Sequence, residues 1–248
     1  MMTWNIRCAT VLLGLGLALN SGHAATMTNA FKALPATPLE VLKKNHIALY
    51  KLYVGGEPYH TKLTAYANMQ GFRQPFENLA TVVHEMIHIA SAIHHGYYVE
   101  GTYYWPDYLD AKNWPSATNN LIEANLRSVE RGPISNIYMS ATPKNHLGNI
   151  LDEINAYSHV IEFVCANEAG SAHKQTRNLL GFLHVEEAYL RVVRSGFPQE
   201  YQRLSNQTET RGALRLITER AWKGLTACGV KAQDIPSQET TYFFSLAP

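Results

Sequence analysis

Residues 75–95 read PFENLATVVHEMIHIASAIHH and carry the strongest helical pattern of the chain. Apolar side chains recur there at the spacing of one helix face, and Gly96 follows at the position where helices commonly end. We therefore expect a long amphipathic helix from about Pro75 to His95. The apolar positions are Leu79, Val83, Met86, Ala90 and Ile93.

The rest of the chain also predicts mainly helical structure. The aromatic tract 97–106 is the exception, because its β-favouring residues on both sides of Glu100 and Gly101 predict a short hairpin. No repeat, low-complexity segment or linker interrupts residues 25–248, so we expect one domain, mainly α with a small β element. Asn206 or Thr208 could act as the N-cap of the last expected helix. The further helices are expected at residues 37–53, 116–131, 144–167, 172–195 and 207–227.

The motif HExxH lies inside the helix expected from Pro75 to His95, as His84, Glu85 and His88. Residues four apart share one helix face, so the two imidazoles can bind one tetrahedral zinc ion. Glu85 lies beside the first histidine, where it can take a proton from a metal-activated water. The motif predicts a zinc site with Glu85 as general base.

A catalytic zinc normally takes a third protein ligand, and Glu153 is our first candidate. It is the one carboxylate on a broad apolar face of the helix expected at 144–167. A buried carboxylate must be neutral, paired or bound to a cation. An ordinary buried pairing with an Arg or Tyr is the alternative. The stripe that contains Glu153 consists of His146, Ile150, Tyr157, Val160 and Val164.

His94 is the second candidate, because a third His six residues after HExxH is the metzincin arrangement, in which Met139 would be the methionine turn. That arrangement needs a Gly where this chain has Ser91, and Ser tolerates the left-handed conformation poorly. In a continuous helix His94 is rotated by about 240° from His88 and points away from the metal. His95 would face the right way but lie about 10 Å further along the axis. We therefore favour Glu153.

HExxH on one helix with a glutamate on a later one, in the segment Asp152–Ala156, resembles the gluzincin group of zinc metallopeptidases. The resemblance implies a zincin-like fold, in which one helix carries HExxH and a second carries the third ligand. It also implies that His84, His88 and Glu153 bind zinc and that a Tyr or His stabilises the oxyanion. Thermolysin-like members place a histidine-orienting Asp where this chain has Tyr157. The candidates for the oxyanion role are Tyr103, Tyr157 and His159.

The N-terminus has the layout of a secretory signal peptide, with cleavage expected after Ala24. Its apolar run, Ala9 to Leu19, is well short of the roughly 20 residues that span a bilayer. Cleavage removes Arg7, so the net charge falls from +1 to zero and no basic field would attract nucleic acid. Two cysteines would then remain, Cys165 and Cys228, and export favours a disulfide between them.

These patterns together predict an exported, periplasmic or secreted metallopeptidase with one zinc per chain and no membrane anchor after cleavage. Its partner would be a peptide or protein substrate, with a cell-wall peptide as one option. Two alternatives stay open: a non-catalytic binding or inhibitor module of the same ancestry, and a zinc amidase acting on peptidoglycan. The aromatic residues of 97–114 are expected to lie near the cleft, either as substrate subsites or as plain packing.

Overall fold

The structure is a computed structural model that describes residues 36–107, 109–136 and 146–246. The expected signal peptide and Met139 lie outside these residues. The described chain is mainly helical with one two-stranded sheet, as the sequence predicts. Within these ranges no helix is both long enough and apolar enough to cross a membrane.

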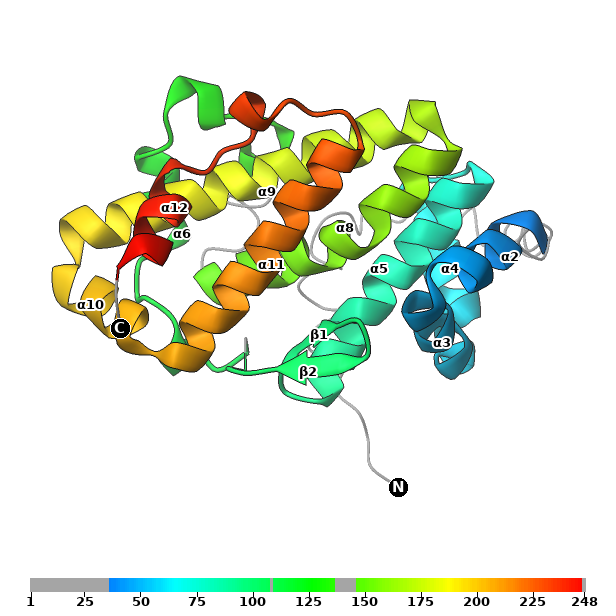
Figure 1. Ribbon diagram of the computed structural model, residues 1–248, viewed down its shortest axis with the longest axis horizontal. Coiled ribbons are helices and arrows are strands. Elements are labelled where there is room, and N and C mark those ends of the chain that lie inside the picture. The colour runs from blue at the N-terminus through cyan, green and yellow to red at the C-terminus, as the bar shows by residue number, and fades with distance from the viewer. Residues whose placement is uncertain (1–35, 108, 137–145, 247–248) are drawn as a thin grey trace, which may run out of the picture.

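Four long helices form the body of the molecule: α5 (Pro75–Ile93), α8 (Leu147–Asn167), α9 (Ala169–Gly196) and α11 (Thr208–Ala227) (Figure 1). Helix α8 packs against the other three. A helix with neighbours on several sides buries most of its circumference, and α8 is buried over nearly its whole length. This explains why the sequence shows a broad apolar face in this segment.

Two hydrophobic cores meet on α8. Leu151, Ile154 and Ile161 face α9 and α11, whereas Val160 and Phe163 pack with α5 and the N-terminal helices. Burying each such side chain contributes roughly 1.5–3 kcal/mol relative to exposure. Because both faces of α8 are fixed by this packing, its position relative to α5 is fixed as well.

Distant parts of the chain define both ends of α5. At its start, the backbone N–H groups of Phe76 and Glu77 donate to the Glu168 carboxylate at 3.1 and 2.8 Å. At its end, the helix stops at Ile93, two residues before the expected His95, and the left-handed residue is His95, with φ 53°. Gly96 is needed for another reason, because a Cβ there would lie 2.9 Å from a backbone oxygen of the hairpin.

The predicted hairpin is confirmed. Strands β1 (Tyr97–Val99) and β2 (Thr102–Tyr104) pair antiparallel around Glu100 and Gly101, which have φ of 51° and 90°. Positive φ at both central residues matches the twist of the flanking strands. Arg220 of α11 forms an ion pair with Glu100, so the turn is tied to the helical body.

The helix expected at 37–53 is wrong in its extent, because two helices, α2 (Ala36–Asn45) and α3 (Ile47–Gly55), lie there. The break falls at His46, whose ring packs edge-on against Phe163 of α8 at 5.7 Å. The apolar spacing alone does not reveal this interruption of the helix, which coincides with a tertiary contact of the His46 ring.

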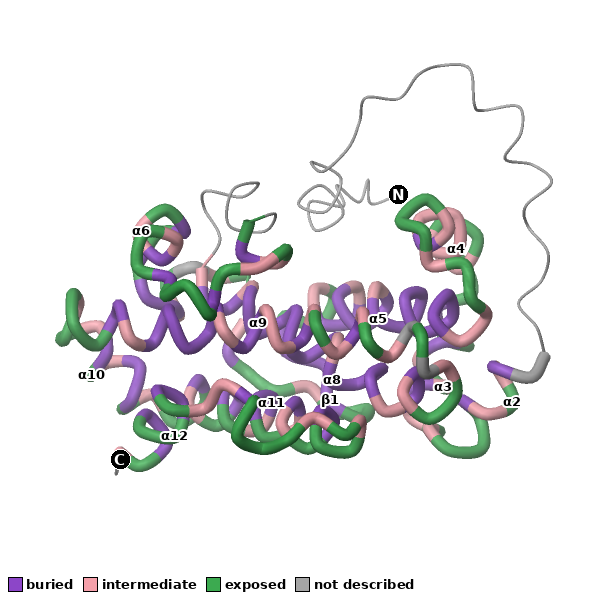
Figure 2. Tube along the Cα trace, turned by 90° about the horizontal axis from the view of Figure 1, so that it is seen from above, coloured by how far each residue is buried: buried purple, intermediate pink, exposed green. Residues whose placement is uncertain are grey.

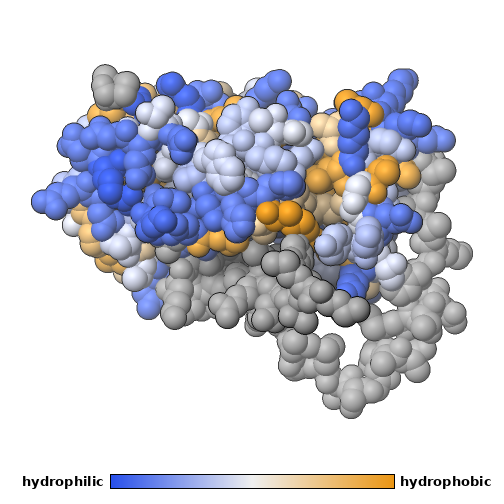
Figure 3. All heavy atoms as spheres, turned by 90° about the horizontal axis from the view of Figure 1, so that it is seen from below, coloured by the Kyte–Doolittle hydropathy of each residue, from blue (hydrophilic) through white to orange (hydrophobic). Residues whose placement is uncertain are grey.

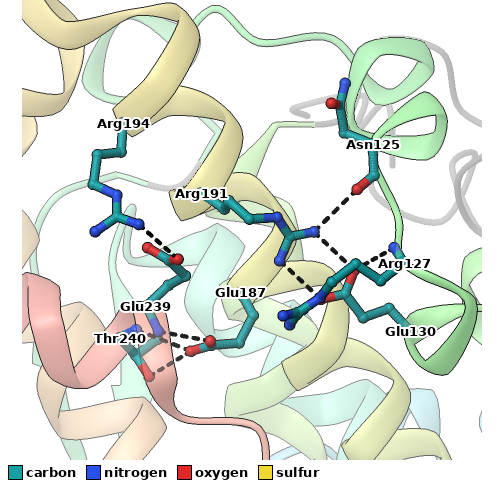
Figure 4. Close-up of polar contacts among 8 residues, drawn as sticks. All are labelled: Asn125, Arg127, Glu130, Glu187, Arg191, Arg194, Glu239 and Thr240. Carbon is teal, nitrogen blue, oxygen red and sulfur yellow. Dashed lines mark hydrogen bonds and ion pairs between the residues drawn. The ribbon is translucent and has the colours of Figure 1, made fainter.

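The helix expected at 116–131 is also wrong in its extent, because only α6 (Asn119–Ala124) and a 3-10 turn at Ser128–Glu130 form. Arg191 of α9 donates to the Asn125 carbonyl at 3.0 Å and to both oxygens of buried Glu130 at 2.8 Å (Figure 4). Arg127 binds the same carboxylate. These side-chain bonds stabilise the irregular segment in place of a continuous helix.

Three helices were not expected from the sequence: α4 (His60–Met69), α10 (Pro198–Asn206) and α12 (Gln238–Ser245). Helix α12 begins where the Glu187 carboxylate of α9 accepts from the N–H groups of Glu239 and Thr240 (Figure 4). The N-cap expected for α11 is wrong, because Gln207 holds that position without a side-chain cap bond. Short 3-10 turns also lie at Glu57–Tyr59, Ala111–Asn113 and Ala232–Asp234.

The predicted disulfide between Cys165 and Cys228 is present, with a Cα–Cα distance of 5.5 Å. It joins the C-terminal ends of α8 and α11.

The short helices α4 and α6 lie on one side of the long helices. Both stand above the row that α5 and α9 form (Figure 2).

Candidate metal centre

The two histidines of HExxH lie on one buried face of α5. Their Nε2 atoms are 3.0 Å apart, and each residue is 7% exposed. This is the consequence of one helical turn between positions 84 and 88. Two imidazole nitrogens therefore point at one small volume.

Glu153 of α8 completes this group. Its Oε2 lies 3.5 Å from His84 Nε2 and 3.6 Å from His88 Nε2. The ligand atoms of the three residues all lie within 4.8 Å of one another, and all three side chains are buried. The packing of α8 against α5 thus brings together the three residues that the sequence pattern singles out, and the group could hold a metal ion.

Asp152 has a role that the sequence pattern did not reveal. Its Oδ2 lies 2.5 Å from Nδ1 of His88, and Asp152 is 4% exposed. A carboxylate on the second ring nitrogen fixes the orientation of a metal-ligating histidine and raises its basicity. Asp152 is therefore placed to orient His88 if the group holds a metal ion.

The charges in this group stabilise one another. Burial opposes ionisation of Glu153, but His88 and His84 outweigh it and hold the pKa of this carboxyl far below its usual range. Burial alone would lower the pKa of His88, yet Asp152 and Glu153 raise that pKa well above its ordinary value. A buried histidine that holds its proton between two carboxylates is an electrostatic setting in which a metal ion can replace that proton.

Glu85 lies at the edge of this group and lines a cavity of about 320 Å³ together with His84 and Glu153. Burial raises the pKa of Glu85, His84 and His88 lower it, and Glu153 and Asp152 raise it again, with a net increase. A carboxylate whose pKa is raised toward neutrality is a better proton acceptor for catalysis near pH 7.

Two tyrosines line the same cavity, Tyr157 of α8 and Tyr66 of α4. The Tyr157 ring packs edge-on against His84 at 4.4 Å, and its hydroxyl accepts from Asn178 Nδ2 at 3.1 Å. Burial raises the pKa of both phenols, with Glu85 and Glu153 adding to the effect, so both stay protonated donors. Tyr66 could not be selected from the sequence because the pattern did not predict α4.

The other oxyanion candidates lie elsewhere. His159 Nδ1 donates to the Asn155 carbonyl at 2.7 Å, and its Nε2 accepts from the hairpin at 3.4 Å. Burial lowers its pKa to about 3, so it is a neutral structural residue. Tyr103 packs against exposed His94, 4.0 Å away between ring centroids. His94 is not part of the group that could hold a metal ion, as the helical rotation predicts.

Comparison with known proteins finds no matching family model, no similar curated protein and no similar solved structure. The assignment of a function therefore depends on the arrangement of these side chains.

The aromatic tract is not where we expected it. Among the described residues, none from 97–114 lines the cavity beside Glu85. Tyr98 and Tyr103 instead line a second hollow of about 390 Å³ that touches another face of α5 at Met86 and Ile93. Figure 3 shows hydrophobic residues gathered on the right of the face seen from below, at the end of the molecule where α3 lies. Tyr97 and Tyr98 of the hairpin are buried in the two hydrophobic cores, and the hairpin is separate from His84, His88 and Glu153.

Proposed function

We propose that this protein is an exported zinc-dependent hydrolase, specifically a metallopeptidase, with His84, His88 and Glu153 as zinc ligands. The observation that carries the proposal is the convergence of two imidazole nitrogens and one carboxylate oxygen beside Glu85 and a cavity. Ligand atoms of a tetrahedral zinc site lie roughly 3.3 Å apart. The observed separations of 3.0, 3.5 and 3.6 Å fit that spacing before any adjustment.

The donor set itself favours a catalytic over a structural site. Catalytic zinc sites typically use three protein ligands and leave one position open, whereas structural sites use four. Within the described ranges the group has three members, and the cavity adjoins it on the side of His84 and Glu85. This supports an enzyme over a non-catalytic module with a closed site.

The residues of the chain have distinct roles in the proposed reaction. Bound zinc would supply Lewis-acid polarisation of the substrate carbonyl and an acidified water. Glu85 would accept a proton from that water and deliver it to the leaving amine. The hydroxyl of Tyr66 or Tyr157 would donate to the oxygen on which negative charge develops. Asp152 would hold His88 in the orientation that ligation needs.

Export is supported by the disulfide, because such bonds persist in oxidising compartments. The zero net charge expected of the mature chain gives no reason to propose a nucleic-acid partner. A peptide or protein is the proposed substrate. An amide in peptidoglycan is the second candidate, since the same residues would cleave it.

Metal analysis combined with two variants tests the proposal. The mature protein should contain about one zinc per chain, and His84→Ala should lose it. Glu85→Gln should keep the zinc and lose hydrolysis of a peptide library by about 10²–10⁴-fold, the usual contribution of a general base. The matched control is Glu57→Gln, a change at an exposed glutamate, which should alter neither property. Full zinc occupancy in His84→Ala, or full activity in Glu85→Gln, would refute the assignment.

A further inference from the structure

Two cationic side chains of α9 line the cavity that Glu85 of α5 also lines. Lys174 and Arg177 lie on one face of α9, next to Asn178. The Lys174 ammonium is 3.7 Å from the ring centre of Phe72, which lines the same cavity. This contact holds one positive charge at the cavity wall.

Neither cation is neutralised by another described residue. Within the described parts of the chain, no ion pair joins Lys174 or Arg177 to a carboxylate. The acidic residues of the cavity lining are Glu85 and Glu153, both of which belong to the proposed catalytic group. The two cations are therefore available to a ligand, and the planar fork of an arginine matches the two oxygens of a carboxylate.

Gln175 lies between these two residues in sequence and lines the same cavity. It is 3% exposed, and its Oε1 has no hydrogen-bond partner in the described structure. A buried acceptor without a donor is unfavourable, so a ligand that brings an N–H group would satisfy it. A cavity that offers two cations and a hydrogen-bond acceptor matches a carboxylate with a neighbouring amide.

We propose that this cavity is a specificity subsite in which Lys174 and Arg177 bind a substrate carboxylate near the scissile bond. The inference rests on the proposed function, because it places the carboxylate beside Glu85 and the zinc ligands. The carboxylate can come from the C-terminus of the peptide or from an acidic side chain. The cavity volume of about 320 Å³ is at the low end of ligand pockets, so it suits a short segment.

Binding of four matched short peptides tests this subsite. They share one sequence and combine a free or amidated C-terminus with Glu or Gln at the penultimate position. Their affinities are measured by calorimetry for zinc-loaded Glu85→Gln protein, so that no peptide is cleaved. The same series is measured after Lys174→Gln and Arg177→Gln are added together, and after the exposed control Lys231→Gln is added instead.

We expect at least one carboxylate peptide to bind about tenfold or more tightly than the peptide that lacks both carboxylates, as for hydrogen bonds to charged groups. The double change at Lys174 and Arg177 should remove that preference, while the Lys231 control should retain it. The peptide that shows the preference identifies the source of the carboxylate. Equal binding of all four peptides, or a preference that survives the double change, would overturn the proposal.

A second arm separates this inference from the proposed function. The peptide series is repeated without zinc on wild-type protein and on the Lys174→Gln, Arg177→Gln double variant. A carboxylate preference that depends on Lys174 and Arg177 in this arm supports the subsite even if the protein binds no zinc or hydrolyses nothing. Absence of the preference in both arms overturns the subsite while zinc content and hydrolysis still report on the metal centre.

Discussion

Replacing Asp152 by Asn tests whether this residue positions His88 in the proposed metal centre. The change keeps the shape of the side chain and removes its charge. It disrupts the 2.5 Å interaction between Asp152 Oδ2 and His88 Nδ1, in a buried environment where solvent does not screen the charges. The three proposed ligands, His84, His88 and Glu153, remain in the variant.

The expected magnitude follows from that interaction. Loss of a partner that orients a metal-ligating histidine typically weakens metal binding by about 10–100-fold, or roughly 1.4–2.7 kcal/mol. Competition with a chromophoric zinc chelator measures the dissociation constant directly. Circular dichroism of the metal-free protein shows whether the helices are intact.

Asp107 provides a matched control, because its Oδ2 lies 3.0 Å from Nδ1 of another histidine, the exposed His95. Asp107→Asn breaks an aspartate–histidine pair that lies outside the metal-binding group and should leave zinc affinity unchanged. Unchanged affinity in Asp152→Asn, or an equal loss in both variants, would refute the assignment of Asp152 as a positioning residue.

Three further predictions follow from the structure. Glu153→Ala should weaken zinc binding by more than about 100-fold, because it removes a proposed ligand and not a residue that orients one. His94→Ala should leave zinc affinity unchanged, and the reverse result in a chelator titration would indicate a metzincin-like site. Replacing Cys165 and Cys228 by Ser should lower the free energy of unfolding by about 4 kcal/mol in denaturant titrations, since the bridge closes a loop with a sequence separation of 63. Burial raises the pKa of Glu186 from its ordinary value of 4.5 to about 8 in the folded protein. The stabilisation from this difference is fully present below pH 4.5 and is lost as the pH rises through 8. The free energy of unfolding should therefore fall with rising pH by up to about 5 kcal/mol less in Glu186→Gln than in the wild type. Identical pH profiles of unfolding free energy for the two proteins would contradict the burial argument.

The sequence determined the features that depend on neighbours along the chain. The spacing of four residues between His84 and His88 places both rings on one face of any helix that contains them. The hairpin followed from β-favouring residues around Glu100 and Gly101, where a turn is local by nature. The disulfide followed from the two cysteines expected in the mature chain. Glu153 could be selected because a lone carboxylate on an apolar face must be neutral, paired or bound to a cation.

Only the tertiary structure decided which distant side chains meet. Asp152 and Tyr66 reach the metal group because α8 is fixed by its two apolar faces and α4 packs beside α5. The starts of α5 and α12 depend on carboxylates from Glu168 and Glu187, whose partners lie far away in sequence. Helical periodicity specifies which residues share a face, whereas the partner of that face is set by packing of the whole chain. That packing separates the aromatic hairpin from the cavity beside Glu85.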